Sequence, residues 1–328
     1  MEKEKKKLTP EQVRERNISL SLTVGVILLL IGGLVLATSS WEKMNHLMKV
    51  LSIGGVSLLF FGISYIAGTY LKIEKTAFAF LTLASLLIPV TFVGIGYFQL
   101  FGEWLSLFGE GKYILGVIAT LICFPLYTWI AIQNKNRLFI WLSLFTLTVM
   151  TGFVLAALYV PIDVFYFGMI IYNGLLLAGY HYYKSDQRVM NFTQELPLFT
   201  QANLIISTLL MLVFFQNHLL YSVNILLTAV MYIAIVFVYN RKEFHIVFSL
   251  LFVYGMYQLL ENTFLQPLNY LGFALIGIIY ILLEDRIADG FLKKVFRVTS
   301  GIVSGLAFLY ISFEGLVVRA DEKSIVYY

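Results

Sequence analysis

The feature that most constrains this chain is a succession of apolar runs, each about twenty residues long. A helix needs roughly 20 apolar residues to cross the hydrocarbon of a bilayer. Backbone amides cannot stay unpaired in lipid, so each run is expected to be helical. The sequence therefore predicts an all-α, polytopic transmembrane helical bundle of about 11 spans. The predicted spans are residues 18–39, 47–70, 77–101, 113–132, 138–159, 164–183, 199–216, 219–239, 244–262, 265–283 and 294–316.

The composition supports lipid as the main solvent of the chain. Hydrophobic residues make up 59% and charged residues 13%, whereas soluble domains are nearer half apolar and a quarter charged. A chain with so few charges could not cover its apolar surface in water. The one cysteine, Cys123, excludes an intrachain disulfide and any CxxC motif, and we expect it to be a small buried hydrophobe.

The positions of the lysines and arginines predict how the spans are oriented. When the N-terminus is placed in the cytoplasm and the spans alternate, 18 of the 23 basic residues fall on the cytoplasmic side. This bias follows the positive-inside rule, so we expect a cytoplasmic N-terminus and an extracytoplasmic C-terminus. The basic residues left outside are Lys43, Lys49, Lys112, Arg319 and Lys323.

Three segments follow from this threading. Residues 1–17 are predicted to be a cytoplasmic leader, residues 18–316 the transmembrane helical domain, and residues 317–328 a short extracytoplasmic tail. In the leader, "TPEQ" at Thr9–Gln12 has the pattern of a helix start, which predicts a short surface helix. Acidic residues offset the basic ones there, so no nucleic-acid partner is expected. The first span is not predicted to be a cleaved signal, because no A-x-A site follows it.

Two kinds of motif inside the spans bear on packing. Pro89 and Pro125 lie near the middle of their spans, where proline removes a backbone hydrogen bond and kinks a helix. We expect these kinks to shape the bundle, with a gating hinge as the alternative. Gly301 and Gly305 form a GxxxG motif in the last span. Small residues at this spacing let two helices approach closely, either within the chain or between two copies of it.

Polar chemistry inside the spans is sparse. Asn173 is the most interior polar side chain, and we expect it to tie two helices by hydrogen bonds or, alternatively, to line a cavity. Asp163, Glu261 and Glu314 fall near outer span ends, where water is within reach. The four histidines lie at span ends without a shared helix face, so no metal, haem or other cofactor site is predicted. No catalytic residue is assigned.

The densest charge in the second half is "LLEDRIADGFLKKVFR", Leu282–Arg297. It superficially resembles the motif of membrane phosphotransferases that use CDP-linked lipids, in which aspartates hold a metal and phosphates. Here the Asp spacing differs, Lys293–Lys294 replaces Ala-Arg, and no further Asp follows in the helix. We therefore interpret the segment as a cytoplasmic turn whose basic residues anchor the last span.

One broader resemblance concerns the block from Trp41 to Gly102, which contains "LKIEKTAFAFLTLASLLIPVTF". This block resembles a group of uncharacterised polytopic membrane proteins of Gram-positive bacteria. In that group, helical hairpins have a basic cytoplasmic turn, a run of small and aromatic residues, and an Ile-Pro inside the next span. The resemblance implies a bacterial plasma membrane location and no activity, cofactor or site.

Three classes of function are compatible with these features. The expected function is that of a non-catalytic membrane scaffold or a subunit of an envelope complex. The alternative is a transporter or flippase for a neutral or amphipathic, lipid-like solute. A membrane transferase that uses lipid-linked donors is the third. The expected partners are membrane lipids, together with another membrane protein or a second copy of the chain.

Overall fold

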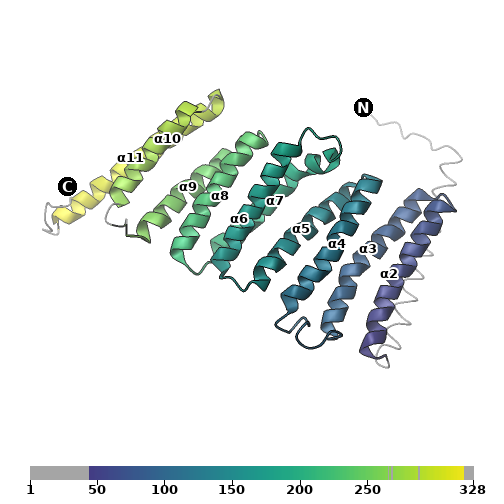
Figure 1. The fold of residues 1–328 in the computed structure, drawn as a ribbon. Coiled ribbons are helices and arrows are strands. Elements are labelled where there is room, and N and C mark those ends of the chain that lie inside the picture. Colours follow the sequence, from purple (N-terminus) through teal and green to yellow (C-terminus); the bar gives the residue numbers. More distant parts are fainter. Residues whose placement is uncertain (1–43, 265, 267–268, 287–288, 321–328) are drawn as a thin grey trace, which may run out of the picture. The chain divides into compact units, whose positions relative to one another are not determined.

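The computed structural model describes residues 44–264, 266, 269–286 and 289–320, and their regular structure is predominantly α-helical (Figure 1). The predicted leader (residues 1–17) and the first predicted span (18–39) lie outside the described residues. The helices are α2 (His46–Thr69), α3 (Glu74–Tyr97), α4 (Lys112–Asn134), α5 (Arg137–Ala157), α6 (Ile162–Tyr183), α7 (Met190–Val213), α8 (His218–Val238), α9 (Phe244–Glu261), α10 (Asn269–Arg286) and α11 (Gly290–Ala320).

Within these ranges, nine helices are long and apolar enough to cross a membrane. They are α2 to α9 and the Gly290–Phe313 part of α11, while α10 contributes a shorter apolar stretch, Leu275–Glu284. The all-α class is therefore confirmed for the described residues, and their long apolar helices are compatible with a multi-pass helical membrane bundle. The count of about 11 spans and the orientation of the termini stay predictions.

The helix bounds follow the apolar runs closely except at α7. The sequence predicts a span from residue 199, whereas α7 begins at Met190 and continues through Pro197. The mostly polar stretch "NFTQE" at 191–195 interrupts the apolar pattern that the prediction relied on. Their place in the helix is explained by burial: Thr193 is 4% exposed, and its hydroxyl donates to the Met190 carbonyl at 3.0 Å.

The chain divides into two compact units, residues 1–157 and residues 158–328. The sequence patterns predict a single helical domain over 18–316 and do not indicate this division. Each unit is described by itself below.

In the first unit, buried hydroxyls join neighbouring helices. Ser57 and Ser64 on α2 donate to the carbonyls of Ala84 and Ala77 on α3, at 2.8 and 2.7 Å. On the next pair, the Thr128 hydroxyl of α4 and the Ser143 hydroxyl of α5 lie 2.6 Å apart. Small hydroxyl residues thus replace apolar contacts where the helices approach, as is common in membrane bundles.

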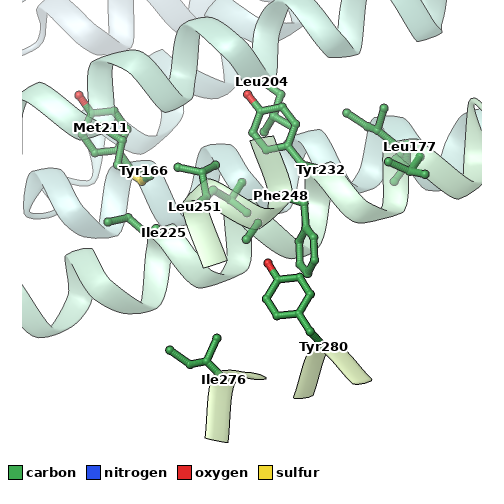
Figure 2. Packing of buried hydrophobic residues seen from close by; sticks show 14 of the residues in the cluster. Tyr166, Leu177, Leu204, Met211, Ile225, Tyr232, Phe248, Leu251, Ile276 and Tyr280 are labelled. Atoms are coloured by element: carbon green, nitrogen blue, oxygen red, sulfur yellow. The ribbon is translucent and has the colours of Figure 1, made fainter. Parts of the chain in front are cut away.

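In the second unit, one core of large side chains links α6 to α11. Figure 2 shows Phe248 of α9 near Tyr280 of α10, and their ring centroids lie 6.1 Å apart. Tyr280 and Tyr232 of α8 are both almost fully buried. Helix α6 contacts both α7 and α8, whereas α7 and α8 touch each other over a much shorter stretch. Helix α8 is thus a central helix of this unit, and half of the residues in its 18-residue apolar stretch are buried.

Asp163 connects three elements at one end of the second unit. Its carboxylate accepts hydrogen bonds from the backbone N–H of Asn217 at 2.8 Å and of Gln216 at 3.2 Å. The backbone carbonyl of Asp163 accepts from the side-chain amide of Asn224 on α8, at 2.7 Å. Asp163 is 1% exposed, so the expectation that it reaches water is wrong. The donors of the α7–α8 turn take the place of water as partners of the carboxylate.

Candidate functional site

The most site-like feature of the described residues is an apolar pocket in the first unit, between α3, α4 and α5. Its volume is about 530 Å³, which lies within the range of about 300–1,000 Å³ that is typical of ligand sites. Three groups of residues line it. They are Leu86, Pro89, Phe92 and Val93 of α3; Leu107 of the following loop with Lys112, Tyr113, Leu115, Gly116, Ala119, Thr120, Cys123 and Tyr127 of α4; and Leu142, Phe145, Thr146, Val149 and Phe153 of α5.

The loop between α3 and α4 forms one end of the pocket. Residues 98–111 are longer than a tight turn, so the two helices need not pack against each other directly. The backbone N–H of Leu107 donates to the Gly96 carbonyl at 3.2 Å, and the N–H of Gly111 donates to the Trp104 carbonyl at 2.8 Å. These bonds fold the loop back onto the end of α3, and the Leu107 side chain enters the lining.

Pro89 lies in the α3 wall of the pocket and leaves one carbonyl of α3 without its usual hydrogen-bond donor. Proline has no N–H, so the carbonyl of Ser85, four residues earlier, has no donor from its own helix. The Tyr127 hydroxyl of α4 donates to this carbonyl at 3.1 Å. Tyr127 thus links α4 to α3 at the place where Pro89 leaves a carbonyl without its usual donor. A hinge motion at Pro89 stays a prediction. Pro125 lies inside α4, and its predicted kink likewise stays a prediction.

Gly116 permits the close approach of α4 and α5 beside the pocket. A Cβ atom at this position would lie 2.6 Å from the Phe153 ring, a distance that real Cβ atoms do not show. The hydroxyl of Thr120 donates to the Gly116 carbonyl at 2.8 Å, so it is occupied within its own helix. Cys123 is 3% exposed and free, as expected for a buried hydrophobe. The pocket walls therefore present mainly carbon atoms.

Asn173 has its hydrogen-bonding atoms occupied inside the second unit. Its amide nitrogen donates to the Met169 carbonyl at 2.9 Å, and its amide oxygen accepts from Asn203 of α7 at 2.9 Å. It is 1% exposed. Such interhelical bonds contribute about 0.6 kcal/mol on average in membrane bundles. Asn173 thus ties α6 to α7, and the sequence did not indicate its partner because the pairing depends on how two separate helices face.

Charged side chains of the Leu282–Arg297 segment form ion pairs that join neighbouring elements. Glu284 of α10 accepts from the Arg297 Nε atom of α11 at 3.0 Å. Asp289 forms an ion pair with Lys242, which lies just before α9. The second oxygen of Asp289, Oδ1, accepts from the backbone N–H of Leu292 at 3.0 Å and caps α11. The segment therefore joins helices through its charges, in agreement with its interpretation as a turn.

The Lys242–Asp289 pair predicts a dependence of stability on pH. The Lys242 ammonium, followed by the N–H of Leu292, holds the pKa of Asp289 below its usual 3.8. A carboxyl with a lowered pKa stabilises the folded chain above that usual value, and the stabilisation is lost as pH falls through the lowered pKa. We expect Asp289→Asn to lower the thermal unfolding midpoint slightly at pH 7 and to have a smaller effect at pH 3. Asparagine keeps the capping oxygen, so an equal effect at both pH values would contradict this account of the pair.

The packing of α11 against α10 uses serines beside the predicted GxxxG motif. The Ser300 hydroxyl donates to the Gly277 carbonyl at 2.9 Å, and a Cβ at Gly277 would collide with Ser304. Gly301 and Gly305 are exposed, and a Cβ at either would meet no heavy atom within 4 Å in the described part of the chain. The predicted packing of these glycines against a helix of the same chain is not seen among the described residues.

Two further findings complete the description. In the residues that the structure covers, no three His, Cys, Asp or Glu side chains come together as ligands of a metal ion would. Comparisons of the chain with protein-family models, with curated proteins and with solved structures gave no match.

Proposed function

We propose that this chain is a non-catalytic multi-pass membrane protein that takes up a lipid-like, amphipathic molecule from the bilayer, as a transporter or flippase for such a solute does. The observation that carries this proposal is the pocket of about 530 Å³ between α3, α4 and α5. Its walls are apolar, and the hydroxyls of Thr120 and Tyr127 already donate to backbone carbonyls. Away from Lys112, a polar solute would lose hydration in this pocket and gain few polar partners, whereas a hydrocarbon chain has no hydrogen bonds with water to lose.

The pocket is also accessible from the side. Leu86, Val93 and Phe145 belong to its lining and are 40%, 54% and 59% exposed. In a bilayer, exposed apolar side chains of spanning helices face lipid. A lipid chain therefore has a route into the pocket that does not cross water.

Filling the pocket tests the proposal. Ala119 lines the pocket, whereas its neighbour Ile118 is 38% exposed and lies outside the lining. We expect Ala119→Phe to lower the amount of lipid that co-purifies with the full chain several-fold, because the ring occupies the space of the lipid chain. Ile118→Phe adds a ring to the same helix and is expected to retain the wild-type amount. Native mass spectrometry of the purified protein measures both, and equal lipid retention by the two variants would overturn the proposal.

A scaffold or subunit function is the second candidate, and α11 supplies the observation that favours it. Gly301 and Gly305 leave a small-residue face open among the described residues, and such faces let another helix approach closely. A membrane-protein partner or a second copy of this chain would fit there. Cross-linking between two copies through a cysteine at position 301 tests the second of these, in a background where Cys123 is replaced by alanine.

For location, we propose the bacterial plasma membrane with the N-terminus in the cytoplasm. The supporting observation is the distribution of basic residues, 18 of 23 on the predicted cytoplasmic side. A reporter that is active only in the cytoplasm is expected to be silent when fused to the C-terminus and active when fused after Asn134. Activity at the C-terminus would contradict the proposed orientation.

A further inference from the structure

We propose that the pocket between α3, α4 and α5 holds one chain of an anionic lipid, whose head group lies at Lys112. This inference rests on the proposed function, because it names the chemical class of the amphiphile that the pocket takes up.

Among the described residues that line this pocket, Lys112 is the one that carries a charge. It is the first residue of α4, it is exposed, and its Nζ atom lies 5.1 Å from the centre of the Tyr113 ring. Glu103 and Glu110 precede it in the loop, and neither lines the pocket. The amino end of α4 carries the positive end of the helix dipole at the same place. An anionic group at the mouth of the pocket would therefore be attracted both by the Lys112 ammonium and by the positive end of the α4 dipole.

The depth of the pocket suits a lipid chain. Its lining on α4 runs from Lys112 to Tyr127, which is about 22 Å at 1.5 Å per residue. The hydrocarbon of a bilayer is about 30 Å thick. A chain that enters beside a head group at Lys112 would thus pass the middle of the bilayer before it reaches Tyr127.

The far end of the pocket is unsuited to a head group. The Tyr127 hydroxyl donates a hydrogen bond to the Ser85 carbonyl at 3.1 Å. Its neighbour in the lining, Cys123, is 3% exposed. A charged group at this depth would have no counter-ion in the lining and would bear a large desolvation cost. The head group is therefore assigned to the Lys112 end and the methyl end of the chain to the Tyr127 end.

Photo-crosslinking tests the assignment in the full chain. The protein is placed in phosphatidylcholine nanodiscs that contain a small share of one of two probes. The probes are phosphatidylglycerol and phosphatidylcholine with the same diazirine-bearing acyl chain, and mass spectrometry locates the labelled residues on α4. Lys112→Gln removes the charge. Lys49→Gln is the matched control, because Lys49 also lies over an aromatic ring, at 5.3 Å from the Phe98 centroid, but does not line the pocket.

We expect the phosphatidylglycerol probe to label the pocket residues of α4 about fivefold more than the phosphatidylcholine probe, the factor that one lysine near a membrane surface supplies. Lys112→Gln should bring the two probes to parity, and Lys49→Gln should not. Equal labelling by both probes in the wild type, or a preference that survives Lys112→Gln, overturns the head-group assignment and leaves the proposed function standing. If neither probe labels the pocket above the level at lipid-facing Leu121, the proposed function falls as well.

Discussion

Replacing Asp163 by alanine is expected to lower the free energy of unfolding of the full chain by about 3 kcal/mol. The carboxylate is 1% exposed and accepts from the backbone N–H of Gln216 and Asn217. Alanine would remove the acceptor of both backbone donors at a partly buried site, and hydrogen bonds to a charged group contribute about 1.5–3 kcal/mol each. The variant should also loosen the α7–α8 turn, because Asp163 is what connects that turn to α6.

Unfolding of the purified protein in mixed micelles with a denaturing detergent measures this change. Asp163→Asn keeps one acceptor oxygen, so it is expected to lose about half as much stability. Asp186→Ala is the control, because Asp186 is exposed and accepts a single local bond from the Arg188 N–H at 2.9 Å. Its effect should stay within about 0.5 kcal/mol. A similarly small effect of Asp163→Ala would show that water reaches the turn and replaces the carboxylate.

Gly116→Val is expected to destabilise the first unit by about 2 kcal/mol through overpacking. A Cβ at this position would lie 2.6 Å from the Phe153 ring, so α4 and α5 must separate or the ring must move. Phe153 also lines the pocket, and a displaced ring would change the pocket's shape. Lipid retention should therefore fall together with stability.

A second substitution tests whether the close approach to Phe153 is the cause. Phe153→Ala removes the ring that the new side chain would meet, so the double variant should lose less stability than the sum of the two single variants. The same detergent titration measures all three variants. If the two changes simply add, valine at 116 acts through the backbone of α4 and the close approach to Phe153 is not its cause.

The elements of the fold were predictable because lipid imposes one rule on every span. A backbone in hydrocarbon must pair within itself, so each apolar run in the described part of the chain gave a helix, and apart from the start of α7 the bounds agree within a few residues. The start of α7 was missed for the same reason: the prediction relied on apolarity, and residues 191–195 are mostly polar yet helical. The burial of Thr193 is not indicated by the local sequence.

The side-chain partners were less predictable, since they depend on how helices face each other. Asn173 was predicted to tie helices, but its partner Asn203 could not be identified from one sequence. Asp163 lies near a span end as predicted, yet the fold of the α7–α8 turn buries it. The GxxxG motif pointed to a close approach on α11, and the approach occurs at Ser300 and Ser304, against Gly277.

No pattern in the sequence predicted the pocket. The pocket depends on how α3, α4 and α5 pack together, on the fold of the 98–111 loop and on the close approach of Gly116 to Phe153. Pro89 was visible as a proline inside a span, and its role becomes clear only with Tyr127 beside the Ser85 carbonyl. Sequence patterns thus predict which residues are unusual, and the packing decides what they do.

The central claim is that the pocket between α3, α4 and α5 holds a lipid chain, and electron cryomicroscopy of the full chain in lipid nanodiscs tests it most directly. The account predicts elongated density along α4 from the level of Lys112 to the level of Tyr127, separate from protein density. Closure of the pocket by α3 moving onto α4 and α5 would contradict the claim. Density for a segment of the chain itself in that space, such as residues 18–39, would contradict it equally.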